Sequence, residues 1–141
     1  MRIAVVDGQG GGIGKALVEK LRAAFGDDIE ILALGTNAVV TSLMLKAGAT
    51  EGSSGENAIV INAPKVDVII GSVAIIAANT MLGELTPRMA EAISTSPAKK
   101  ILLPLNRCGI YVVGTKQEPL TSCIEAAVQL VKDCAVLSPS N

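Results

Sequence analysis

A glycine-rich segment near the N-terminus is the part of this sequence best suited to bind a ligand. Five of the seven residues from Gly8 to Gly14 are glycine, and Lys15 follows them. A glycine in place of alanine costs roughly 0.4–1 kcal/mol through the extra freedom of the unfolded chain, so five cost about 2–5 kcal/mol. Because a domain is typically stable by only about 5–15 kcal/mol, we expect either positive φ angles here or a group that approaches the backbone closely.

This segment lies where a buried strand is predicted to meet a helix. Ile3–Val6 is a short apolar run rich in β-branched residues, and Ile13, Leu17 and Leu21 recur at helical spacing. The start of a helix offers unpaired N–H groups and the positive end of the helix dipole, which together bind anions. We therefore predict that a phosphate group binds here, with the contacts supplied by Gly8, Gln9, Gly10, Gly11, Gly12, Ile13, Gly14 and Lys15. The alternative is a tight turn whose glycines only let the helix pack on the strand.

The turn resembles the dinucleotide-binding turn of the short-chain dehydrogenases, through Gly8-x3-Gly12-x-Gly14. NAD or NADP is therefore a candidate cofactor, with another nucleotide as the alternative. The catalytic Tyr-x3-Lys pair of those enzymes is missing, because the only tyrosine, Tyr111, is followed four positions on by Thr115.

The turn is also similar to the deviant P-loop of the ParA/MinD-like ATPases, through the residues from Gly11 to Lys15. Ala16 stands where those proteins place a serine or threonine on Mg²⁺. Without that hydroxyl, hydrolysis dependent on Mg²⁺ loses a ligand. The sequence therefore favours nucleotide binding over ATP hydrolysis.

Polar residues follow the next predicted strands, at the edge of the sheet where ligands of open α/β folds bind. Thr36 and Asn37 come after the strand 29–34, and Ser72 comes after the strand 66–70. We expect Thr36 and Asn37 to face a ribose or its 2′-phosphate and Ser72 to contact the ligand. The alternative for Thr36 is to cap the following helix. No acidic residue at this point would hold the ribose of NAD.

Five further residues are candidates to contact a substrate, namely Asp7, Asn79, Asn106, Arg107 and Cys108. Asp7 would act as a base or hold a hydroxyl, although an aspartate here also orders its own turn. Arg107 would pair with a phosphate or a carboxylate and lower the pKa of the neighbouring Cys108. No catalytic residue can be assigned from these positions, and no metal site is expected.

Alternation of strands and helices predicts a three-layer α/β/α fold of the Rossmann-like, doubly wound kind. Strands are predicted at 3–6, 29–34, 66–70, 101–105 and 110–113, and the final helix at 120–135. The last two strands are joined by four residues, too few to cross over, so the last strand is expected to be antiparallel in an otherwise parallel sheet. One domain should cover residues 1–136, with a flexible tail at 137–141.

Composition excludes several classes of function. The chain of 141 residues has no histidine and no tryptophan, which excludes a Ser-His-Asp triad and histidine-ligated metals within one chain. A net charge of −1 without a basic run argues against nucleic-acid binding. Three cysteines without CxxC spacing, and no targeting or membrane segment, favour the cytoplasm. The apolar segment 72–82 is either part of the core or a candidate surface for a homodimer.

Four motifs together resemble a small bacterial family known as domain of unknown function 3842. They are the segments 7–15, 33–37, 55–60 and 103–108. The resemblance covers nearly the whole chain and implies a bacterial, cytosolic protein without an assigned activity. Within it, the N-terminal turn resembles those of Rossmann-like dinucleotide-binding proteins. The sequence therefore predicts a protein that binds a nucleotide or dinucleotide, with an enzyme for a phosphorylated metabolite or a regulatory interaction module as alternatives.

Overall fold

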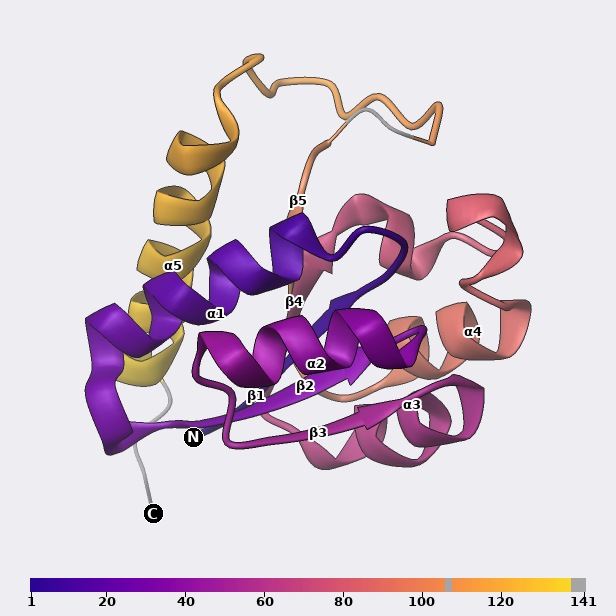
Figure 1. Ribbon diagram of the computed structural model, residues 1–141. Coiled ribbons are helices and arrows are strands. Elements are labelled where there is room, and N and C mark those ends of the chain that lie inside the picture. The colour runs from indigo at the N-terminus through magenta and orange to yellow at the C-terminus, as the bar shows by residue number, and fades with distance from the viewer. Residues whose placement is uncertain (106–107, 138–141) are drawn as a thin grey trace.

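Five parallel strands form one sheet in the computed structural model, which describes residues 1–105 and 108–137. The strand order is β3-β2-β1-β4-β5 (Figure 1). The strands are β1 (Arg2–Asp7), β2 (Glu30–Gly35), β3 (Glu51–Ser54), β4 (Val68–Ser72) and β5 (Lys99–Leu103). The α-helices are α1 (Gly12–Phe25), α2 (Ala38–Ala47), α3 (Glu56–Asn62), α4 (Pro87–Thr95) and α5 (Leu120–Leu137). Short 3-10 turns are η1 (Gly26–Asp28), η2 (Ala63–Lys65), η3 (Val73–Ile76) and η4 (Met81–Gly83).

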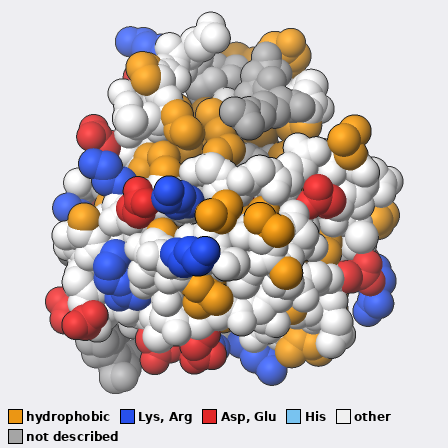
Figure 2. Space-filling model, in the orientation of Figure 1, with side chains coloured by type: hydrophobic (Ala, Val, Ile, Leu, Met, Phe, Trp, Pro, Cys, Tyr) orange, Lys and Arg blue, Asp and Glu red, His pale blue; other side chains and the backbone are white. Residues whose placement is uncertain are grey.

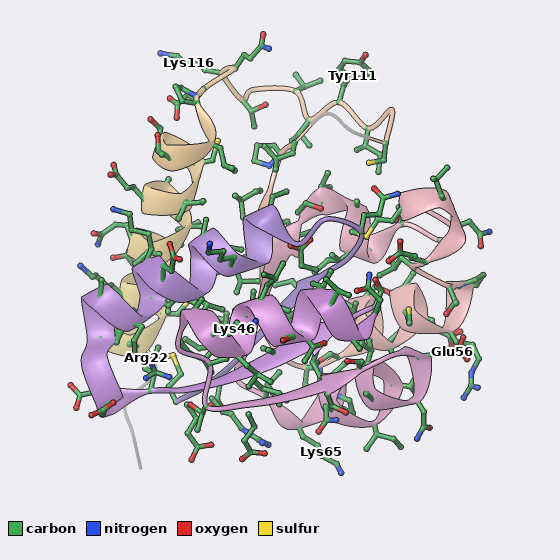
Figure 3. The ribbon with its side chains drawn as sticks, viewed as in Figure 1. Arg22, Lys46, Glu56, Lys65, Tyr111 and Lys116 are labelled. Carbon is green, nitrogen blue, oxygen red and sulfur yellow. The ribbon has the colours of Figure 1, made fainter. Side chains whose placement is uncertain are left out.

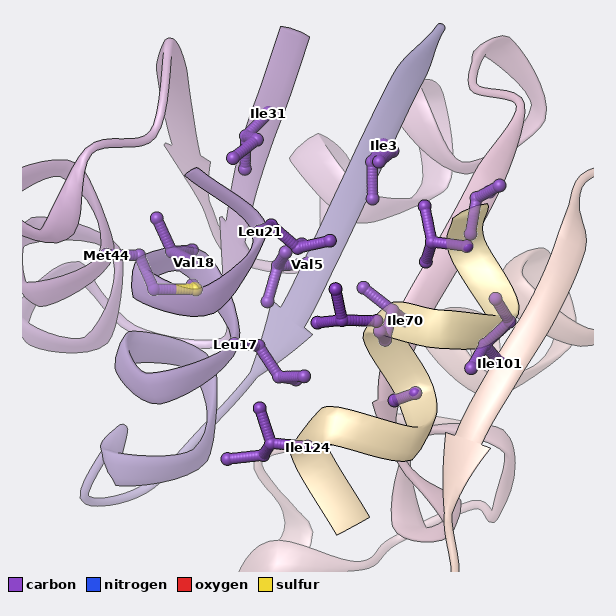
Figure 4. Packing of buried hydrophobic residues seen from close by; sticks show 14 of the residues in the cluster. Ile3, Val5, Leu17, Val18, Leu21, Ile31, Met44, Ile70, Ile101 and Ile124 are labelled. Atoms are coloured by element: carbon purple, nitrogen blue, oxygen red, sulfur yellow. The ribbon is translucent and has the colours of Figure 1, made fainter. Parts of the chain in front are cut away.

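Helices cover both faces of this sheet, as expected for a three-layer α/β fold. Helices α1, α2 and α5 pack on one face, and α3 and α4 pack on the other. Because successive strand residues point to opposite faces, Ile3 and Val5 join the first hydrophobic cluster, and Ala4 and Val6 join the second. Figure 4 shows the first cluster. The two-sided burial explains why β1 is apolar throughout.

Helix α1 holds the glycine-rich turn at the carboxyl end of β1. Leu17 and Leu21 on its inner face are fully buried, and each such side chain stabilises the fold by about 1.5–3 kcal/mol. The helix ends at Gly26, which has a φ of 58° and donates its N–H to the carbonyl of Arg22. The packed end of α1 therefore fixes where its first turn lies.

The order of the strands reverses between β1 and β4. The chain leaves β1 for β2 through α1, on one face of the sheet, and later reaches β4, on the other side of β1, through α3 on the opposite face. Open α/β sheets bind ligands at the carboxyl ends of the strands where the order reverses. A ligand site is therefore expected at the carboxyl ends of β1 and β4.

The expected antiparallel last strand is wrong. Residues 110–113 form no strand, and β5 pairs in parallel with β4. The sheet ends at Leu103, where the N–H of Leu105 donates to the carbonyl of Leu103 at 2.9 Å. Pro104 between them has no N–H to extend a ladder. The antiparallel pair expected from residues 101–105 and 110–113 therefore does not form.

The segment 108–119 instead extends from the end of the sheet without a helix or strand (Figure 1). The side chain of Tyr111 is 77% exposed and that of Val113 is 99% exposed, and Tyr111 lies on this extension, away from the sheet (Figure 3). β-Branched and aromatic residues favour strands only where a partner strand and a packed face exist. Residues 110–113 have neither.

Two further local differences concern β3 and the start of α2. Glu51–Ser54, which is not among the predicted strands, forms the edge strand β3, and Gly55 precedes α3 without a side-chain cap. Asn37, rather than Thr36, caps α2 by accepting a hydrogen bond from the N–H of Val40 at 3.0 Å. The predicted boundary of the domain at residue 136 and the predicted homodimer stay predictions, and the tail residues 138–141 lie outside the described residues.

Charged side chains of both signs are interspersed over the lower part of the face in Figure 2. Hydrophobic side chains gather at the upper end of that face, where the segment 108–119 lies. Of the helices in the described part of the chain, none is long and apolar enough to cross a membrane.

Candidate functional site

A cavity of about 410 Å³ opens at the carboxyl ends of β1 and β4, at the point where the strand order reverses. Four parts of the chain contribute to its wall: the glycine-rich turn, the end of β4, the segment before α4, and the region that precedes and begins α5. The lining residues are Asp7, Gly8, Gln9, Gly10, Gly11, Gly12, Ile13, Ser72, Ala74, Thr80, Met81, Leu82, Cys108 and Leu120. The predicted turn thus forms one wall of a cavity.

Asp7 fixes the shape of the turn. Its side chain is only 6% exposed. One carboxylate oxygen accepts a hydrogen bond from the N–H of Gly8 at 2.8 Å, and the other accepts one from the N–H of Gly14 at 2.6 Å. Hydrogen bonds to a carboxylate are short and strong. The sequence left open whether Asp7 orders the turn or acts as a base. These contacts support the role in ordering the turn.

Three N–H groups of the turn have no hydrogen-bond acceptor within the described residues. These are the N–H groups of Gly10, Gly12 and Ile13, the last two in the first turn of α1. The neighbouring N–H groups are occupied, because Gln9 donates to Glu84 and Gly11 donates to the carbonyl of Gly8. All of these residues line the cavity except Glu84. The turn therefore presents free donors where an anion could enter.

The glycines of the turn serve different purposes. Gly11 has a φ of 74°, which favours glycine. A methyl group on Gly14 would lie 2.7 Å from the sulfur of Met44, so this glycine lets α1 and α2 pack closely. Gly10 and Gly12 have neither a positive φ nor any atom within 4 Å of the position a Cβ would take. Nothing in the described fold requires glycine at positions 10 and 12.

Glu84, in the segment between β4 and α4, accepts hydrogen bonds from two other parts of the chain. Its Oε1 atom accepts hydrogen bonds from the Thr36 hydroxyl at 2.6 Å, from the Asn37 side-chain amide at 2.9 Å and from the N–H of Gln9 at 3.0 Å. The hydroxyl of Thr36, the amide of Asn37 and the N–H of Gln9 lower the pKa of Glu84 against the opposing effect of burial. Glu84 thus ties the end of β2 to the glycine-rich turn.

The segment that supplies Glu84 also covers part of the turn (Figure 1). A methyl group on Gly8 would lie 2.5 Å from the sulfur of Met81 and 2.6 Å from the hydroxyl of Thr36. Leu82 is 97% exposed, at the rim of the cavity. Among the described residues other than glycine, positive φ angles occur only in this segment and in the turn, at Gln9, Asn79, Met81 and Leu82. Such backbone conformations cluster at functional sites.

The structure brings most of the predicted site residues to the cavity. Ser72 is buried at the end of β4, where its hydroxyl oxygen accepts the N–H of Ala74 at 3.3 Å, and Cys108 lies on the wall. Lys15 is exposed and does not line the cavity, and Asn79 is exposed with its N–H donated to the carbonyl of Leu85. The predicted substrate contacts Asn106 and Arg107 lie outside the described residues.

Sequence reasoning missed Met81, Leu82 and Glu84, together with Leu120. Glu84 is 48 positions from Thr36 along the chain, so no local spacing could connect them. Gly83, which has a φ of 89°, marks a turn in this segment but not the direction of its side chains. In the part of the chain that the structure describes, no group of three His, Cys, Asp or Glu side chains could hold a metal ion.

Comparisons with known proteins place the chain in a family without defining its ligand. A crystal structure of a universal stress protein in complex with cAMP is similar to this structure, with a TM-score of 0.39 and 15% sequence identity over 70% of this chain and 94% of that one. No curated protein matches the sequence. The family model described as "Domain of unknown function (DUF3842)" matches residues 2–136, and the chain therefore belongs to this family.

Proposed function

We propose that this protein binds a nucleotide or a similar small phosphate ester, with a phosphate group on the N–H groups of Gly10, Gly12 and Ile13. One observation carries the proposal. These three N–H groups have no acceptor within the described residues, and their residues line a cavity of about 410 Å³.

The position of these N–H groups supports a negatively charged ligand. Gly12 and Ile13 begin α1, a helix of 14 residues, and the start of a helix carries a partial positive charge from its aligned peptide dipoles. Phosphate oxygens accept hydrogen bonds from such N–H groups. Lys15, one turn into the same helix and exposed, does not line the cavity and adds a positive charge to the first turn of the helix.

The absence of side chains at Gly10 and Gly12 supports close approach of a ligand. Each of these glycines costs roughly 0.4–1 kcal/mol relative to alanine through the unfolded chain. Neither a positive φ nor a packing contact offsets this cost in the described fold. A phosphate that contacts the bare backbone would offset the cost of these glycines. It could approach the backbone only because no Cβ occupies its place.

The remaining walls suit the organic part of a ligand. Leu82, Leu120 and Met81 are apolar, while Ser72 offers a hydroxyl at the end of β4 and Cys108 a thiol. The cavity volume falls within the about 300–1,000 Å³ typical of small-molecule sites. The dinucleotides NAD and NADP, to which the sequence pattern of the turn points, belong among the ligands to be compared.

The cavity favours binding over catalysis. Among the described residues that line it, Asp7 is the only carboxylate, and both of its oxygens accept N–H groups of the turn. The chain has no histidine, so the thiol of Cys108 lacks the imidazole base that commonly activates a cysteine. We therefore assign the site a binding role.

Thermal denaturation in the presence of single ligands tests the proposal. AMP, GMP, ATP, FMN, NAD, NADP and inorganic phosphate would each be added to the purified protein. A ligand at about 100 times its Kd should stabilise the fold by about 2.7 kcal/mol. At the same ligand concentration, Gly12→Ala should lower this stabilisation to about 1.4 kcal/mol or less. The control Ala23→Ser, at an exposed position near the far end of α1, should retain it in full.

Two results would contradict the proposal. In the first, none of the ligands raises the unfolding temperature. In the second, a ligand does so equally in the wild type and in the Gly10→Ala and Gly12→Ala variants, which would place its phosphate elsewhere.

A further inference from the structure

We infer that the ligand of the glycine-rich turn is a mononucleotide rather than a dinucleotide, because Glu84 and Met81 fill the place at the end of β2 where the adenosine ribose of a dinucleotide would lie. This inference rests on the proposed function. It adds the direction in which the ligand extends from its phosphate and the residues that set this direction.

The end of β2 is the reference point for a dinucleotide. In doubly wound folds with a glycine-rich turn after β1, the pyrophosphate lies on the turn and the adenosine ribose binds at the end of the next strand, often to an acidic side chain. In this protein β2 ends at Gly35, and the next two residues are Thr36 and Asn37. Their polar groups are the ones that a ribose would meet first.

Those polar groups already form hydrogen bonds within the protein. The hydroxyl of Thr36 and the side-chain amide of Asn37 both donate to Oε1 of Glu84, at 2.6 and 2.9 Å. The carbonyl oxygen of the Asn37 amide accepts the N–H of Val40. A ribose at this point would have to displace Glu84 and leave its carboxylate without these donors, which costs more than a neutral hydrogen bond would.

Side chains also fill the space between the turn and the end of β2. The sulfur of Met81 and the hydroxyl of Thr36 both lie within 2.6 Å of the position that a Cβ on Gly8 would occupy. Neither Thr36 nor Asn37 nor Glu84 belongs to the wall of the cavity. The cavity therefore does not reach the adenosine side of the turn.

The segment 79–85, which covers the turn and is called the covering segment below, is held in place by its own backbone and side chains. Its position therefore does not depend on Glu84 alone. The N–H of Asn79 donates to the carbonyl of Leu85 at 2.8 Å, and the N–H of Leu85 donates to the carbonyl of Thr80 at 3.3 Å. The hydroxyl of Thr80 donates to the carbonyl of Ala74 at 2.7 Å. These contacts anchor the segment to the chain that follows β4.

The cavity is open in the opposite direction. From Gly10 and Gly12 it extends to Ser72 at the end of β4 and Ala74 just after it, and to Cys108 and Leu120 beyond β5. A sugar and base attached to a phosphate on the turn would therefore lie over β4, not over β2. The negative charge of Glu84 beside the turn adds a repulsion that would weaken binding of a 2′-phosphate, as in NADP.

Isothermal titration calorimetry with defined probes tests the inference. The 5′-monophosphates of adenosine, guanosine, cytidine and uridine would be compared with NAD, NADP and inorganic phosphate. We expect the best mononucleotide to bind the wild type at least about tenfold more tightly than NAD, a difference of about 1.4 kcal/mol.

Variants of the covering segment provide the second half of the test. Met81→Ala, alone and combined with Glu84→Gln, should open the β2 side and move the ratio of NAD to mononucleotide affinity toward NAD by roughly tenfold. Glu56→Gln is the matched control, because this carboxylate pairs with Arg88 away from the cavity and should leave the ratio unchanged. Circular dichroism would establish that each variant is folded. If the double variant does not fold, Met81→Ala alone is enough for the test.

The possible failures are distinguishable. If no probe binds the wild type, the proposed phosphate site itself is wrong. If NAD binds as tightly as the best mononucleotide, or the ratio does not change in Met81→Ala, or inorganic phosphate alone binds, this inference is overturned. In each of the last three cases, loss of binding in Gly12→Ala would still support the proposed phosphate site.

Discussion

The carboxylate of Asp7, at the end of β1, accepts a hydrogen bond of 2.6 Å from the N–H of Gly14, in the first turn of α1. Its other oxygen accepts the N–H of Gly8. One side chain thus joins the first and last glycines of the turn. The contact fixes the position of Gly12 and Ile13, which line the cavity, relative to the end of β1.

Replacement of Asp7 by asparagine should destabilise the protein by about 1–3 kcal/mol, because the NH₂ group that replaces one oxygen cannot accept an N–H from the turn. Urea denaturation would measure the loss. Asp27→Asn, at an exposed position in η1, is the control and should change stability by less than about 0.5 kcal/mol. An equally small effect at Asp7 would contradict the structural role given to its carboxylate.

Alanine at position 12 should lower ligand affinity without lowering the stability of the fold. Because Gly12 has a negative φ and open space around its Cβ position, Gly12→Ala should leave stability unchanged or raise it by about 0.4–1 kcal/mol. Ligand affinity should fall by roughly tenfold or more. Urea denaturation and calorimetry on the same preparation would measure both quantities.

Alanine at position 14 should behave differently. A Cβ there would press against the sulfur of Met44 and the side chain of Asp7, and overpacking of this kind costs about 1–3 kcal/mol. Urea denaturation of Gly14→Ala should show this loss without any ligand present. Equal stability of the Gly12→Ala and Gly14→Ala variants would contradict the packing described here.

Acid should weaken the contact between the turn and the end of β2. The pKa of Glu84 lies below its ordinary value of 4.5 in the folded protein, chiefly because Thr36 donates to it. The folded state therefore holds this proton more weakly than the unfolded state does, so the stabilisation is present above the ordinary pKa and disappears as pH falls through the lowered one.

The matching measurement compares wild type with Glu84→Gln. Their difference in unfolding free energy should be constant well above pH 4.5 and should shrink as the solution becomes more acidic. Glu56→Gln serves as the control, since no such set of donors surrounds that exposed pair with Arg88. A difference between wild type and Glu84→Gln that is independent of pH would contradict the ionised contact.

Hydrogen exchange should distinguish β5 from the segment that follows it. The amides of Ile101 and Leu103 lie in a strand paired with β4 and should exchange slowly. Those of Tyr111 and Val113 lie in exposed chain without a ladder partner and should exchange within the earliest time points. Slow exchange at residues 110–113 would revive the discarded antiparallel strand.

The turn could be predicted from the sequence because its signals are local. A β-branched run, five glycines and a helical pattern from Ile13 to Leu21 follow one another directly, and each specifies the conformation of its own residues. Where structure follows from neighbours in the chain, the prediction was confirmed.

The failures have a common physical origin in contacts between distant segments. Residues 110–113 have the composition of a strand, but whether a strand forms depends on a partner that the sheet does not provide. The expectation that Thr36 and Asn37 face a sugar stays a prediction, but the sequence did not indicate that both donate to a carboxylate 48 positions from Thr36. Nothing near residue 36 in the sequence specifies that Glu84 lies beside it.

The open space at Gly10 and Gly12 has an evolutionary consequence. On the proposed function, a descendant of this protein that had lost its ligand would gain stability from alanine at these two positions, so selection would no longer preserve their glycines. Gly14 would persist in such a lineage, because Met44 and Asp7 leave no room for a side chain. Divergence at positions 10 and 12 with retention of glycine at 14 would therefore mark the branches of the family that have ceased to bind.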